Sequence, residues 1–203
     1  MLYTRRTLLS LTPARLDLVD TALGLLADHE LASSTLAVRV AAMVRADLHE
    51  AVGAGLNVIG GTRHGGASMR IEALLRDAAR SGPASALAGR LNDDARTLGF
   101  GHPLYPAGDP RAVALLERLP GIDPPGDRLA TVQAVLDAVA ARDEAPPNVD
   151  VALGAISVCA DMPAGSGDAI FALARTTGWI AHALEQYDQP TFMRARVDYT
   201  GRR

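Results

Sequence analysis

The sequence contains few cysteines, few aromatic residues and no excess of positive charge, and each shortage excludes a class of protein. Cys159 is the single cysteine in 203 residues, so no intrachain disulfide can form, and a reducing, cytoplasmic location is expected. Aromatic residues make up 4% of the chain, too few for a platform that stacks single-stranded nucleic acid. The net charge of −3 and the lack of basic clusters argue against general binding to nucleic acid or anionic membranes.

Long apolar runs and strand-like alternation are also missing. No stretch reaches the length of a membrane span, and the apolar residues near the start are too interrupted for a secretory signal. Apolar residues instead recur at steps of three and four, without internal repeats, which predicts an all-α fold. The expected helices cover residues 14–28, 33–58, 68–80, 111–119, 129–142, 151–160 and 170–186, and the expected short extended tail covers 192–201.

The motifs of several common catalytic sites do not occur in the sequence. There is no HExxH, no HxH and no cysteine pair, so no metal site is expected. The stretch "GGTRHGG" lacks the Lys-Ser/Thr ending of a P-loop. There is no Gly-x-Ser-x-Gly, and Ser166 falls in an expected linker, which disfavours a nucleophilic triad.

Two histidines lie on turn-rich segments, where glycine allows the backbone to approach a ligand closely. His64 lies in "GGTRHGGAS" and His102 lies in "LGFGHPLYPAGDPRA". Local context leaves a structural and a functional role equally open for both. Several arginines accompany them, and because guanidinium groups bind carboxylates bidentately, a di- or tricarboxylate ligand is one interpretation. A surface salt bridge is the simpler interpretation for any one arginine taken alone.

Six segments, in order, resemble the citrate synthase family, and in particular its bacterial citrate-synthase-like proteins, over about residues 25–201. They are "LADHELASSTLAVRVAA", "GGTRHGGAS", "GFGHPLYPAGDPRA", "PPNVDVALGAI", "FALARTTGWIAHALEQ" and "FMRARVDYTG". The resemblance implies a two-lobed helical fold that lacks much of the N-terminal part of the large domain. Residues 1–70 and 161–203 would be remnants of that large domain, and residues 71–160 would form the small domain.

The resemblance also implies an activity, the condensation of acetyl-CoA or another short acyl-CoA with oxaloacetate to give citrate and CoA. His64 would stabilise the enol of the thioester, Asp150 would remove its α-proton, and His102 would polarise the keto group. The coenzyme A thioester would be a substrate, and no tightly bound cofactor is implied. The implied substrate-binding residues are His29, Arg111, Arg175 and, reaching into the site of the other subunit in a dimer, Arg194; the implied coenzyme A loop is Gly99, Phe100 and Gly101.

The sequence departs from the family pattern at Thr62, Pro103 and Ala195, which bears on coenzyme A affinity and on the choice of acyl group. It also begins just before "ADHE", where the family has a long helical region. We therefore expect a homodimer, or a hetero-oligomer with a separately encoded N-terminal half. Two alternatives stay open. The chain could be a non-catalytic paralogue that binds a di- or tricarboxylate or regulates a full-length synthase, or it could be a citryl-CoA lyase.

Overall fold

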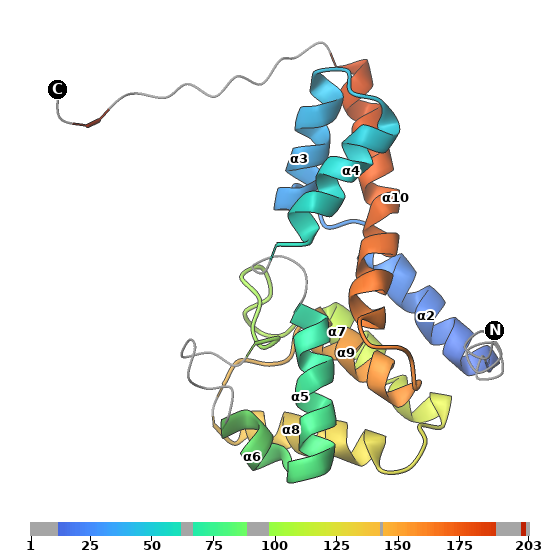
Figure 1. The fold of residues 1–203 in the computed structure, drawn as a ribbon, viewed down its shortest axis with the longest axis vertical. Coiled ribbons are helices and arrows are strands. Elements are labelled where there is room, and N and C mark those ends of the chain that lie inside the picture. Colours follow the sequence, from blue (N-terminus) through green and yellow to red (C-terminus); the bar gives the residue numbers. More distant parts are fainter. Residues whose placement is uncertain (1–11, 62–66, 89–97, 143, 190–199, 202–203) are drawn as a thin grey trace.

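The computed structural model describes residues 12–61, 67–88, 98–142, 144–189 and 200–201, and its regular structure there is helical (Figure 1). Within these ranges the only pairing of extended backbone is one isolated bridge between Phe100 and Pro147, so the all-α prediction is confirmed. No helix in the described part is long and apolar enough to cross a membrane. The helices are α2 (Pro13–Leu26), α3 (Ser33–Met43), α4 (Leu48–Ile59), α5 (Ala67–Ser81), α6 (Pro83–Ala88), α7 (Pro110–Leu116), the 3₁₀ helix η1 (Leu119–Ile122), α8 (Arg128–Ala140), α9 (Val149–Cys159) and α10 (Ser166–Asp188).

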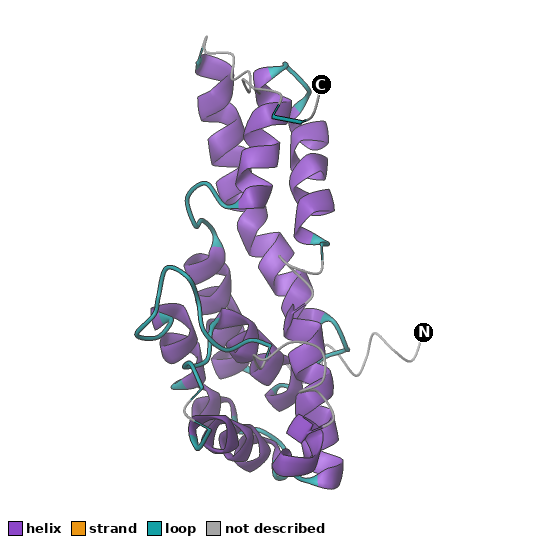
Figure 2. Ribbon diagram, turned by 90° about the vertical axis from the view of Figure 1, so that its left-hand side faces the viewer, coloured by secondary structure: helices purple, strands orange, loops and turns teal. Residues whose placement is uncertain are grey.

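Helix α10 connects two groups of helices (Figures 1 and 2). Beside its C-terminal half lie α3 and α4, which pack around the fully buried Trp179 in a small apolar core. Beside its N-terminal half lie α2 and α5 to α9, which form a larger core. Every residue of α9 except Asp150 is buried there. Because an apolar surface on all sides can be buried only if other helices surround it, α9 occupies the centre of the larger group.

Residues 33–58 form two helices, whereas the apolar pattern predicted one. After α3 ends, Arg45 adopts the left-handed conformation with φ of +65°. Asp47 then caps α4, because its carboxylate accepts a hydrogen bond from the Glu50 N–H (3.0 Å) and the Glu50 side chain accepts one from the Asp47 N–H (3.3 Å). The sequence contains the Asp-x-x-Glu pattern of this capping box, but the apolar residues on both sides of it predicted one continuous helix.

Helix α10 begins four residues earlier than predicted, within the segment expected to be a linker. The reason is tertiary. Glu72 of α5, only 2% exposed, accepts hydrogen bonds from the N–H groups of Gly165 (3.0 Å) and Gly167 (3.3 Å). Asp168 of α10 in return accepts the hydroxyl of Ser68 at the start of α5. The first N–H groups of a helix have no partner within it, so these carboxylates stabilise the two helix starts.

We expect Glu72→Ala to lower the free energy of unfolding by about 2–3 kcal/mol, because the part-buried Gly165 N–H and the buried Gly167 N–H lose a charged acceptor. Urea unfolding followed by circular dichroism measures the change. Glu117→Ala, at the exposed end of α7, is the matched control and should change the free energy by less than about 0.5 kcal/mol. Equal stability of the two variants would contradict the role given to Glu72.

Candidate active site

Three aromatic rings from two distant segments meet in the folded chain. His29 lies in the loop between α2 and α3, and His102 and Tyr105 lie in the turn segment, residues 98–109, that precedes α7. The ring centroids of His29 and His102 are 5.4 Å apart, and those of His102 and Tyr105 are 4.9 Å apart. His29 Nε2 is hydrogen-bonded to the Tyr105 hydroxyl at 3.1 Å. Two histidines predicted to bind the same substrate therefore share one site.

The turn segment is fixed to the start of α9 by backbone hydrogen bonds. Gly101 N–H donates to the Pro146 carbonyl (2.7 Å), Asn148 N–H donates to the Gly99 carbonyl (2.9 Å), and the Asn148 side-chain amide donates to the Gly101 carbonyl (3.0 Å). Gly99 and Gly101 have φ of +85° and +80°, a region that residues with a side chain rarely adopt. A Cβ on Gly99 would also lie 2.8 Å from Ile71. The glycines thus allow the histidine-bearing turn to lie against the helix end.

Arg111, in the first turn of α7, is held by the carboxylate of Asp109. The Nε–H of Arg111 donates to Oδ1 (2.9 Å) and an Nη2–H donates to Oδ2 (2.8 Å). Asp109 is 1% exposed and Arg111 is 8% exposed. Oδ2 also accepts the Val149 N–H (3.1 Å), which ties the pair to α9. The guanidinium lies over the Tyr105 ring, 5.3 Å from its centroid, so Arg111 belongs to the same site as the imidazoles.

Arg175 supplies a second buried guanidinium from the middle of α10. It is 1% exposed, its Nε–H donates to the Leu26 carbonyl (2.9 Å), and it lies over the Phe171 ring. Burial, together with the charge of Arg111, lowers the pKa of Arg175 to about 10. Among the described residues, its guanidinium is hydrogen-bonded to a backbone carbonyl and not to a carboxylate. The site therefore holds two buried cations, of which Arg111 forms a direct ion pair with the Asp109 carboxylate.

These cations favour the neutral form of both imidazoles. Burial lowers the pKa of His29, and the charges of Arg111 and Arg175 lower it further. Burial and then the charge of Arg111 lower the pKa of His102. The Leu104 N–H donates to His102 Nδ1 at 3.1 Å, so the ring proton of the neutral form must be on Nε2. His102 therefore presents an Nε2–H that can donate to a carbonyl oxygen without carrying a full charge.

Asp150 is the second residue of α9, and its N–H donates to the capping side chain of Asn148 (3.0 Å). Burial raises the pKa of Asp150 to about 6, the charge of Asp168 adds to the rise, and the charge of Arg111 opposes it. The preceding N–H, that of Val149, binds Asp109, so Asp150 lies at the end of α9 that carries the Arg111 pair. A carboxylate with a pKa near 6 is a stronger base than an ordinary one and is still mostly ionised at pH 7.

The structure gathers most of the predicted residues around Arg111. His29 and His102 reach it through Tyr105, whereas Arg175 and Asp150 lie within electrostatic reach of its charge. His64 and Arg194 lie outside the residues that the structure describes. In the described part, no group of three His, Cys, Asp or Glu side chains is arranged to hold a metal ion. The assigned roles of the predicted residues, including coenzyme A contact by Gly99, Phe100 and Gly101, stay predictions.

Three residues that organise the site were missed by the sequence analysis, namely Tyr105, Asp109 and Asn148. A signal existed for two of them, since Asp109-Pro and Asn148 each begin a helix and cap its first turn. The capping pattern indicates a helix start, but it does not indicate that the same carboxylate binds an arginine. Nothing in the local sequence distinguishes Tyr105 from an ordinary turn residue.

The fold and the site together define an all-helical protein with two buried arginines and, near them, a carboxylate whose pKa is raised. Residues 2–196 match the family model "Citrate synthase, C-terminal domain". Citrate synthase 2 of Bacillus subtilis (strain 168) is 32% identical over 94% of this chain, and the citrate synthase of Haloferax volcanii is 32% identical over 90% of it. The chain belongs to the citrate synthase family. It spans about half the length of these relatives, 52% and 49% respectively.

Solved structures show the same similarity. The citrate synthase from Thermotoga maritima MSB8 superposes with a TM-score of 0.77 at 26% identity, covering 93% of this chain and 53% of its own. The ternary complex of carboxymethyl coenzyme A and oxaloacetate with the citrate synthase from Thermoplasma acidophilum gives 0.77 at 29% identity, covering 95% and 54%. A citryl-CoA lyase from Hydrogenobacter thermophilus shares the fold, with a TM-score of 0.82 at 23% identity, covering 95% of this chain and 79% of the lyase.

We expect the imidazoles of His29 and His102 to titrate below the ordinary pKa of about 6.5, and the substitution Arg175→Gln to raise the pKa of His29 selectively. The charge of Arg175 lowers the pKa of His29 but is not among the causes that act on His102. Two-dimensional NMR of the ring nitrogens measures both values. Arg175→Lys keeps the charge and is the control. Equal shifts of the two histidines in Arg175→Gln would contradict the assignment.

Proposed function

We propose that this chain carries a citrate-synthase-type active site that condenses acetyl-CoA, or another short acyl-CoA, with oxaloacetate. One observation supports the proposal most. Two buried guanidiniums, Arg111 and Arg175, lie close to two imidazoles, His29 and His102, whose pKa values are lowered. A keto diacid offers two carboxylates to the cations and one carbonyl to a neutral imidazole. The archaeal relative that binds carboxymethyl coenzyme A and oxaloacetate together supports the same substrate pair.

The site around Arg111 and Arg175 would hold oxaloacetate. Asp109 uses the Nε and Nη2 groups of Arg111, and within the described residues this leaves Nη1 to face a ligand. Arg175 and His29 would bind the second carboxylate. His102 would donate its Nε2–H to the keto oxygen and so draw electron density from the carbon that is attacked. Fixing the ketone in this way removes most of the translational and rotational cost of bringing the two reactants together.

The acyl-CoA would be activated at Asp150. Its carboxylate takes the α-proton of the thioester, the electron pair moves toward the thioester oxygen, and His64 donates a hydrogen bond to that oxygen. Such a donor lowers the barrier by about 3–4 kcal/mol. The enolic carbon then bonds to the keto carbon, whose oxygen gains a proton through His102. Water cleaves the resulting citryl-CoA thioester, so acetyl-CoA, oxaloacetate and water give citrate and CoA.

Two further contacts complete the proposed site. The Gly99–Gly101 backbone would contact coenzyme A, and Arg194 would reach into the site of the other subunit. The partner would be a second copy or a subunit that carries the N-terminal half of the family fold. Exposed apolar side chains at four-residue steps support association, namely Leu36 and Val40 on α3 and Val44 directly after it. A stripe of this kind is typical of a helix-packing surface.

We also propose that residues 71–160 form the smaller lobe of the assembled enzyme. Residues 1–70 and 161–203 would belong to its larger lobe, which the N-terminal half would complete. Closure of the two lobes would then exclude water around the reactants. A condensing site of this kind needs such a closure, because the enol intermediate must meet the ketone before it is protonated by solvent.

The decisive experiment follows thiol release from acetyl-CoA and oxaloacetate, with the chain alone and with the product of the neighbouring gene. We expect Asp150→Asn to lower kcat by about 10²–10⁴-fold, because the side chain can no longer accept the α-proton. Asp137→Asn, on the exposed face of α8, is the matched control. Oxaloacetate binding without turnover in either mixture would favour the non-catalytic alternative, and cleavage of citryl-CoA without condensation would favour the lyase.

The pH profile of the same assay gives a second prediction. Because Asp150 must be ionised and its pKa is raised to about 6, kcat should fall roughly tenfold per pH unit below about pH 6. Asp168→Asn removes the negative charge that raises this pKa, so the inflection should move to lower pH. The amide oxygen can still accept the Ser68 hydroxyl, which preserves the helix start. An inflection that stays in place or moves upward would contradict this assignment.

A further inference from the structure

One face of α10 contacts the three residues that precede His29 in the chain, Leu26, Ala27 and Asp28. The Nε–H of Arg175 donates to the Leu26 carbonyl (2.9 Å), the Gly178 N–H donates to the Ala27 carbonyl (3.0 Å), and His182 Nε2 lies 3.1 Å from Asp28 Oδ1. The three α10 residues are spaced by three and four positions, so they lie on one side of the helix. The first two contacts satisfy carbonyls at the end of α2 that have no partner within that helix.

The third contact acts on the turn that contains His29. The second carboxylate oxygen of Asp28 accepts the Glu30 N–H at 3.3 Å, so the carboxylate closes a turn around the intervening residue. Glu30 has φ of +52°, an uncommon conformation for a residue with a side chain, which the hydrogen bond to Asp28 helps to hold. The position of the Asp28 carboxylate therefore fixes the direction in which the backbone presents His29.

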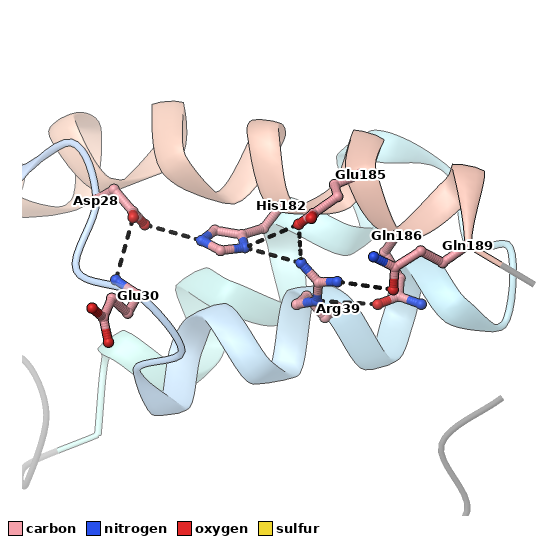
Figure 3. Close-up of polar contacts among 7 residues, drawn as sticks. All are labelled: Asp28, Glu30, Arg39, His182, Glu185, Gln186 and Gln189. Atoms are coloured by element: carbon pink, nitrogen blue, oxygen red, sulfur yellow. Dashed lines mark hydrogen bonds and ion pairs between the residues drawn. The ribbon is translucent and has the colours of Figure 1, made fainter. Parts of the chain in front are cut away.

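The partners of His182 determine which of its ring nitrogens carries the proton. Arg39 Nη1 lies 3.1 Å from Nδ1 of His182, and a guanidinium can only donate, so Nδ1 accepts and Nε2–H donates to Asp28. Arg39 is itself fixed, since it donates to Gln186 Oε1 (3.1 Å), Gln189 Oε1 (3.3 Å) and Glu185 Oε2 (2.5 Å). Figure 3 shows this chain of contacts from Arg39 through His182 to Asp28. The imidazole is thereby oriented from both sides.

We propose that His182 is a positioning residue for substrate binding: through Asp28 it sets the orientation of His29 toward the keto diacid. The proposal rests on the proposed function, because it assumes that His29 binds that substrate. The role depends on the hydrogen-bonding nitrogens of the His182 ring and not on its packing, because His182 is not part of the apolar core around Trp179. Its loss should therefore affect the turn around His29 more than the packing of α3, α4 and α10.

The test compares His182→Gln, whose amide places an N–H close to the position of Nε2, with His182→Leu, which has no donor. We expect His182→Leu to weaken oxaloacetate binding to the chain about tenfold, because a hydrogen bond to a charged group is lost. His182→Gln should stay within about twofold of the wild type. Calorimetric titration with oxaloacetate measures both. His49→Leu, whose side chain is fully exposed on α4, is the control for a histidine-to-leucine change.

Two further readouts separate positioning from a general loss of stability. In an Asp28→Ala background, His182→Leu should cause no further loss of affinity, because it acts through Asp28. The NMR signals of the His29 ring in the free chain should shift in His182→Leu and return in His182→Gln. Full additivity of the two losses, or His29 signals and oxaloacetate affinity that are unchanged in His182→Leu, would overturn the positioning role. Failure of the wild-type chain to bind oxaloacetate would overturn the proposed function instead, and the His29 signals would still decide the role of His182.

Discussion

The carboxylate of Asp109 joins the parts of the site, and the rest of the arrangement depends on it. It is buried and accepts four hydrogen bonds, three from the backbone and side chain of Arg111 and one from the Val149 N–H. A buried charge is tolerated only when its hydrogen-bonding capacity is used in this way. Because its partners come from α7 and α9, the histidine turn, the arginine and the helix that carries Asp150 are held in one fixed relation.

That fixed relation explains the electrostatics of the site. Burial lowers the pKa values of His29 and His102, the charge of Arg111 lowers both further, and the charge of Arg175 adds to the effect on His29. The neutral form of both rings is favoured as a result. Asp150 lies at the opposite extreme, since burial and the charge of Asp168 raise its pKa. An acid–base site needs groups whose environments push their pKa values apart. Here burial at the start of α9 raises the pKa of Asp150, whereas burial near Arg111 and Arg175 lowers the pKa values of the imidazoles.

Helix α10 is the second organising element. Its N-terminal turn binds Glu72, its middle carries Arg175, and its C-terminal half supplies Trp179 to the core between α3 and α4. The loop with His29 lies against the same helix. Gly178 permits that contact, because a Cβ there would lie 2.3 Å from the Ala27 carbonyl oxygen. A side chain held against a long, well-packed helix keeps its geometry better than one on an unsupported loop.

The sequence by itself determined the helical class, the turns and the family, because apolar spacing, glycine and proline, and ordered motifs are local signals. It also predicted histidines, arginines and Asp150 as site residues, although only through resemblance, and their roles stay predictions. The caps at Asp47, Asp109 and Asn148 also have local signals in the sequence, but these signals are weaker than the apolar pattern around them. The tertiary structure decided the early start of α10, the facing of His29 and His102, the shifted pKa values and the chain from Arg39 to His29. Those properties arise from burial and from contacts between residues far apart in sequence, and no short stretch of the chain records them.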